Sequence, residues 1–208
     1  GLARTCRGLG SEDVVPPDLA RPVVPEVEVR HDARRNHHTR ASEPPESLHE
    51  GMRYAVFSGG KRLRPALVFA AAHACGLAPE RALPVAAAVE LLHTATLLHD
   101  DVVDSSPLRR GQPSAMALWG NRRAVLAGDF FYARASSMIV EDGDLDVLYV
   151  FSNTIRLMAE GEILQLQRSF DPSVTEAHYY AVIERKSAAL LSAASEAGAI
   201  LGGVTRAE

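Results

Sequence analysis

Apolar residues recur at helical spacing through most of the chain after residue 46. Leu48, Met52 and Val56 lie on one helix face, because residues three and four apart point to the same side. The same spacing continues to the end of the chain and is interrupted by glycines and prolines. No strand-like alternation of any length is present. We expect helices over about 46–58, 65–75, from between 79 and 84 to about 104, 122–140, 145–169 and 175–201.

The first 45 residues follow a different pattern. Six of the 12 prolines fall there, charged residues are frequent, and no helical apolar period persists. No apolar stretch follows a basic start, so we do not expect a secretory signal. We interpret 1–45 as an irregular or mobile leader rather than a packed unit. Residues 46–208 are interpreted as the front part of a helical domain.

Composition agrees with an all-helical protein. Of the 208 residues, 47% are hydrophobic and 32 are alanine, the best helix former, whereas aromatic residues are only 6%. The net charge of -4 is not that of a basic nucleic-acid binder, so no nucleic-acid partner is expected.

Two location classes are also disfavoured. The best apolar stretch, residues 82–98, is broken by Pro84, Glu90 and His93, so we expect no transmembrane segment. Cys6 and Cys75 are far apart and form no disulfide framework, which favours a reducing, cytoplasmic location.

Three carboxylates end the long central helix. Asp100 and Asp104 are one turn apart on one face, and Asp101 lies beside them. Like charges at this spacing repel, and a bound cation would remove the conflict. Oxygen ligands suit Mg²⁺, which takes one or two carboxylates and leaves other positions to substrate phosphates. A solvated acidic helix end is the alternative that the spacing leaves open.

Cations stand close to this cluster in the sequence. Gly59-Gly60 leads into a helix start with Lys61, Arg62 and Arg64, where free backbone N–H groups favour an anion. Arg109 and Arg110 follow the aspartates. A single arginine guanidinium group can donate two hydrogen bonds to phosphate oxygens. The turn could instead be solvated.

His93 lies on the same helix stripe as the aspartates, two turns before Asp100. A core histidine is the plainer reading of this residue. Taken together, carboxylates and cations beside an apolar helix face indicate a ligand with a diphosphate head and a hydrocarbon tail.

With these residues the chain resembles the trans-polyprenyl diphosphate synthases, in the all-helical isoprenoid synthase family. The resemblance covers about residues 48–203. It rests on Gly-Gly-Lys-Arg-Leu-Arg-Pro at 59–65, the segment His93 to Asp104, Leu108-Arg-Arg-Gly-Gln-Pro113, Gly120-Asn121, Leu126-Ala-Gly-Asp-Phe-Phe131, Ala159-Glu-Gly-Glu162 and Lys186-Ser187. It implies a helical bundle around a central prenyl-chain cavity, and a homodimer.

The resemblance also implies roles for individual residues. It makes the protein a Mg²⁺-dependent prenyltransferase that adds isopentenyl diphosphate head to tail (1'-4) to an allylic diphosphate. The metal ligands would be Asp100, Asp101 and Asp104. Arg109 and Lys186 would contact the allylic diphosphate. The diphosphate of isopentenyl diphosphate would be bound by Lys61, Arg64, His93 and Arg110.

Product length depends on residues below the aspartates. Thr96 and Ala95, four and five residues before Asp100, are small, whereas short-chain synthases of the family place bulky aromatic residues there. Leu92 lies one turn deeper. We therefore expect a product of C20 or longer.

One family feature is missing from this sequence. After Lys186 the only acidic residues are Glu196 and Glu208, so the family's second aspartate-rich motif is absent. We therefore expect the helical domain to be truncated at its C-terminus. Two alternatives stay open, namely a non-catalytic regulatory subunit of a heteromeric prenyl synthase and a class I terpene cyclase. The motifs at 59–65 and 108–113 weigh against the cyclase, which binds no isopentenyl diphosphate.

Overall fold

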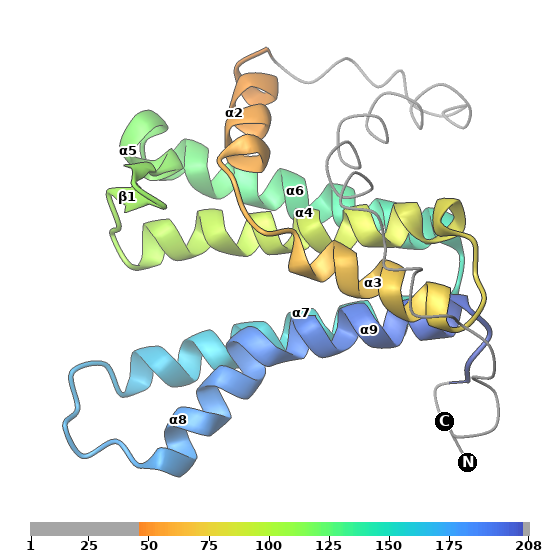
Figure 1. The fold of residues 1–208 in the computed structure, drawn as a ribbon. Helices are drawn as coiled ribbons and strands as arrows, with labels where there is room; N and C mark the ends of the chain where they lie inside the picture. Colours follow the sequence, from red (N-terminus) through yellow and green to blue (C-terminus); the bar gives the residue numbers. More distant parts are fainter. Residues whose placement is uncertain (1–45, 206–208) are drawn as a thin grey trace. The chain divides into compact units, whose positions relative to one another are not determined.

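The computed structural model describes residues 46–205, which are mostly helical (Figure 1). They divide into two compact units, one of residues 63–86 and 139–205 and the other of residues 46–62 and 87–138. Helices α4 (Pro79–Val103) and α6 (Asn121–Asp142) contribute residues to both. The predicted leader, 1–45, lies outside the described residues.

In the first unit, three helices run side by side (Figure 1). Helix α9 (Ala189–Leu201) packs against both α3 (Leu63–Ala74) and α7 (Leu145–Gln167). The buried residues of α9 include Ala193, Ala194 and Ala197, whose small side chains let neighbouring helices approach closely. Before α9, the chain forms α8 (Glu176–Ile183) and a π-helical turn, η3 (Glu184–Ala188).

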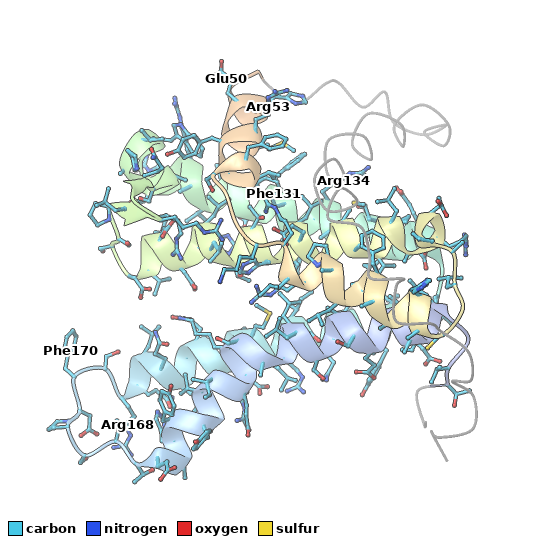
Figure 2. All side chains as sticks on the ribbon, viewed as in Figure 1. Glu50, Arg53, Phe131, Arg134, Arg168 and Phe170 are labelled. Carbon is cyan, nitrogen blue, oxygen red and sulfur yellow. The ribbon has the colours of Figure 1, made fainter. Side chains whose placement is uncertain are left out.

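The second unit contains α2 (Glu46–Phe57), a hairpin and a short helix. The hairpin pairs β1 (Leu108–Arg109) with β2 (Gln112–Pro113), and α5 (Ala115–Trp119) follows. The Tyr54 ring of α2 packs edge-on against Trp119, and its hydroxyl donates to the Pro113 carbonyl at 2.7 Å. These contacts of Tyr54 join helix α2 to the segment that carries the two arginines. Phe131 of α6, labelled in Figure 2, is fully buried.

The all-helical fold class is confirmed, and α2, α3, α6 and α7 begin and end within about three residues of their expected positions. Three details differ from the prediction. The loop at 105–113 contains a hairpin, and the short helix α5 follows it. The range 175–201 is not one α-helix, because η3 interrupts it. Pro84 lies inside α4, which already begins at Pro79.

Helix α4 is the one described helix that is long and apolar enough to cross a membrane. Of its most apolar window, 67% is buried inside the protein. Core helices of water-soluble proteins show the same burial, so length and composition alone do not identify a membrane span. The expectation of no transmembrane segment stays a prediction.

Candidate active site

The aspartates stand at the last turn of α4. The Asp104 amide donates to the Asp100 carbonyl at 2.8 Å, so these residues remain one helical turn apart. The chain leaves the helix at Ser105, whose φ is +49°. Asp101 is buried, Asp100 is half-buried and Asp104 is exposed. The three carboxylates therefore have different surroundings at the end of one helix.

Arg109 on the hairpin is the partner of the buried aspartate. Its Nε and Nη2 both donate to Oδ1 of Asp101, at 2.9 and 2.5 Å. The Asp101 side chain is 4% exposed and that of Arg109 is 30% exposed. The hairpin turns at Arg110 and Gly111, which both have positive φ, the geometry that two-residue hairpins prefer. The loop before β1, in which the Ser106 amide donates to the Asp101 carbonyl at 2.9 Å, returns Arg109 to the end of α4.

The second arginine connects the hairpin to the glycine pair. Nη1 of Arg110 donates to the carbonyl of Gly59. Gly60 has a φ of +135°, which favours glycine, and a Cβ there would lie 2.8 Å from the same Nη1, so that the arginine would have to shift. Lys61 follows and is exposed. The second unit thus brings together the hairpin arginines, one aspartate and the start of the basic turn.

Arg62, the middle cation of that turn, has a structural partner. It forms an ion pair with Glu90 of α4, and its other Nη donates to the Val56 carbonyl. The Glu90 side chain is 5% exposed, so the pair neutralises a buried carboxylate. Sequence reasoning treated Glu90 only as a break in an apolar run. Arg62 and Glu90 are 28 residues apart in the sequence, so the sequence gives no signal of their pairing.

The remaining predicted residues of α4 lie at different depths. Ala95 and Leu92 are buried, and Thr96 is half-buried with its hydroxyl donating to the His93 carbonyl at 2.8 Å. His93 is half-buried. Their predicted roles in product length and diphosphate binding stay proposals.

His99 also connects the aspartate turn to α6. Its Nε2 lies 3.2 Å from the Val125 carbonyl and 3.3 Å from Oδ1 of Asp129. A Cβ at Gly128 would lie too close to this ring, 3.1 Å from Cε1 and nearer still to Nε2. The His99 side chain, which precedes Asp100, therefore packs against Gly128 and Asp129. The resemblance to the family included these two residues in a motif but assigned them no role.

Lys186 and Arg64 belong to the first unit. Arg64 is half-buried in the first turn of α3. Lys186 is the third residue of η3, and its Nζ lies 2.5 Å from Oε2 of Glu162 on α7. The sequence prediction gave Lys186 a role, whereas Glu162 was part of a quoted motif and was given none.

The three aspartates are the candidate oxygen donors for Mg²⁺. Within residues 46–205, no group of three or more His, Cys, Asp or Glu side chains is arranged to hold a metal. Asp100, Asp101 and Asp104 nevertheless offer carboxylate oxygens at one helix end. Mg²⁺ is usually held by one or two carboxylates plus substrate phosphates rather than by a cage of protein ligands. The residues present fit that mode.

Fold and site together define a class of protein. It is all-helical, and one unit holds aspartates, arginines and a basic glycine turn. The family model of polyprenyl synthetase matches residues 45–208. The chain belongs to the polyprenyl synthetase family.

Individual relatives agree with this assignment. The octaprenyl diphosphate synthase of Escherichia coli (strain K12) is 48% identical over 155 residues, which cover 74% of this chain and 48% of that protein. The geranylgeranyl diphosphate synthase of Methanosarcina mazei is 42% identical over 166 residues, covering 77% and 51%. The chain spans about half the length of the curated relatives it matches.

A solved structure shows the same fold. The polyprenyl synthase of Caulobacter crescentus CB15, in complex with calcium and isoprenyl diphosphate, superposes with a TM-score of 0.76 at 44% identity. The match covers 79% of this chain and 50% of that one. The described residues therefore have the fold of this family's solved members.

Proposed function

We propose that the protein is a prenyltransferase that adds isopentenyl diphosphate head to tail (1'-4) to an allylic diphosphate. The observation that carries this is the grouping in one unit of Asp101, Arg109 and Arg110 with the Gly59 turn. Carboxylates that suit a divalent cation and guanidinium groups that suit phosphate oxygens meet at the end of an apolar helix.

In this proposal the allylic diphosphate loses pyrophosphate. Its C1–O bond breaks with both electrons leaving on oxygen, and an allylic carbocation remains. Mg²⁺ bound by Asp100, Asp101 and Asp104 would supply neutralisation of the charge on the leaving oxygens. Arg109 and Lys186 would each donate to the allylic diphosphate.

Isopentenyl diphosphate then forms the new bond. Its double bond attacks C1 of the carbocation, and a proton of the resulting cation is then lost to the released pyrophosphate, which restores a double bond. Its diphosphate is held by four cationic or polar residues, namely Lys61, Arg64, His93 and Arg110. The apolar residues of α4 exclude water, which would otherwise trap the carbocation.

Ala95, Thr96 and Leu92 set the length of the product in this proposal. Small residues at 95 and 96 leave room for a growing chain, so the product is C20 or longer. The relatives with octaprenyl and geranylgeranyl in their names support this range. The solved relative that holds calcium and isoprenyl diphosphate supports a divalent cation and a diphosphate ligand. A cytoplasmic homodimer completes the proposal.

One assay with three arms tests the activity. Purified protein is incubated with Mg²⁺ and farnesyl diphosphate, with labelled isopentenyl diphosphate, without it, or with it plus a separately purified synthase of the family. Elongated product in the first arm supports the proposal. Cyclised hydrocarbon in the second arm would identify a terpene cyclase. No product in the first arm, with a changed product in the third, would identify a regulatory subunit instead.

A further inference from the structure

The π-helical turn η3 interrupts the helical segment that carries Lys186. Such turns are rare, and they occur frequently at functional sites because they alter the direction of a side chain within a helix. Lys186 is the middle residue of η3. The turn thus sets the position of one predicted diphosphate ligand.

Gly161 of α7 is the surface on which this turn rests. A Cβ at residue 161 would lie 2.6 Å from the Lys186 amide nitrogen and 2.8 Å from the Arg185 Cβ. Both distances are shorter than real contacts, and one of them is to backbone. Glycine is therefore required for α7 to approach η3 this closely.

Glu162, the next residue, holds the end of the lysine side chain. Its Oε2 lies 2.5 Å from Nζ of Lys186, and the two side chains are only 18% and 21% exposed. The other oxygen, Oε1, is buried and makes no hydrogen bond within the described residues. Lys186 therefore supplies the charge that offsets a largely buried carboxylate.

We propose that Gly161 and Glu162 are positioning residues for Lys186. Gly161 seats the backbone of the turn, and Glu162 keeps the ammonium in one place before a diphosphate arrives. A cation that is already ordered loses less side-chain freedom when its ligand binds. This inference rests on the proposed function, in which Lys186 contacts the allylic diphosphate.

The chain offers an unusually clean test, because Lys61 and Lys186 are its only lysines. Lys61 is exposed and serves as the internal reference. The rate of acylation at each lysine is measured by peptide mass spectrometry in wild type, Glu162→Ala and Glu162→Gln. We expect the Lys186 rate to rise about tenfold in Glu162→Ala, equivalent to about 1.4 kcal/mol, with Lys61 unchanged.

The glutamine variant separates positioning from simple charge. Its amide oxygen still accepts a hydrogen bond from the ammonium, so it should rescue most of the effect. Glu196→Ala is the control, since Glu196 is an exposed carboxylate of α9, outside η3. A thermal melt of each variant checks folding, and Glu162→Gln keeps the test informative where the alanine variant does not fold.

Inorganic pyrophosphate with Mg²⁺ provides the second measurement. The pyrophosphate concentration that half-protects Lys186 from acylation should rise about tenfold in Glu162→Ala and much less in Glu162→Gln. A carboxylate that only repels the ligand would give the opposite result, tighter binding in both variants. That result, or unchanged Lys186 acylation in both, would overturn the proposal.

Failure of the proposed function has a different signature. If pyrophosphate does not protect Lys186 in the wild type, Lys186 is not a diphosphate ligand. The acylation rates without pyrophosphate still decide whether Glu162 holds the lysine. The two ideas are therefore tested separately.

Discussion

The ion pair between Asp101 and Arg109 gives the most quantitative prediction. Removing one partner of a buried ion pair costs about 3–5 kcal/mol, because the other charge is left without compensation. The Asp101 side chain is 4% exposed, but Arg109 is 30% exposed and partly screened by solvent. We therefore expect Arg109→Ala to lower the free energy of unfolding by about 2–3 kcal/mol in metal-free buffer.

Urea unfolding followed by tryptophan fluorescence measures this loss. Trp119 is the only tryptophan, and it belongs to the unit that contains Arg109. Arg123→Ala, at an exposed position of α6, is the control and should change the free energy of unfolding by less than about 0.5 kcal/mol.

Mg²⁺ adds a second arm to this experiment. In wild type the metal has to compete with Arg109 for Asp101, whereas in Arg109→Ala the carboxylate is available. Saturating Mg²⁺ should therefore reduce the difference in free energy of unfolding between wild type and Arg109→Ala by about 1 kcal/mol. This is the linkage expected for a Mg²⁺ site that is severalfold tighter in the variant. A gap no larger than that of Arg123→Ala would refute the ion-pair argument. A gap that Mg²⁺ leaves unchanged would refute a shared role for Asp101.

Three further predictions follow from individual residues. Gly128→Ala should displace the His99 ring and cost about 1–3 kcal/mol in urea unfolding, and unchanged stability would contradict the close packing. Burial raises the pKa of Asp142 above 3.8, although Arg81 opposes this shift. The pKa of Asp142 is therefore higher in the folded protein than in the unfolded chain. As pH rises from about 3.8 through the folded-state pKa, the free energy of unfolding falls. Asp142→Asn should therefore be more stable than wild type at pH 7 and nearly equal at pH 3, and equal stability at both would contradict the shift. Ala95→Phe should shorten the prenyl product, and an unchanged product distribution by chromatography would contradict the chain-length argument.

Helix positions followed directly from the sequence where apolar spacing and breakers agreed. Helix α7 begins at Leu145, beside Gly143 and the capping Asp144, and ends before Asp171-Pro172. The hairpin could not be found in this way, because strands of two residues show no alternation. The turn η3 was missed because one extra residue in a helix hardly changes its apolar period. The turn packs against Gly161 of α7, which is distant in sequence.

The candidate site was predictable in its residue types but not in its pairings. The sequence offered Lys61, Arg62 and Arg64 as equal cations, whereas the fold uses Arg62 to neutralise Glu90. The sequence likewise gave no sign that Arg109 would form an ion pair with Asp101. Pairings of this kind depend on which helices approach each other, so only the three-dimensional structure reveals them.

The most direct test of the prenyltransferase proposal is the incorporation of labelled isopentenyl diphosphate into farnesyl diphosphate. Wild type, Asp101→Asn and the control Asp171→Asn, on the loop between α7 and α8, are compared with Mg²⁺ and with a chelator, and product length is read by chromatography. We predict products of C20 or longer from wild type and Asp171→Asn with Mg²⁺, and a loss of at least about 100-fold in Asp101→Asn. Equal incorporation by Asp101→Asn and wild type, or incorporation that survives the chelator, would contradict the account.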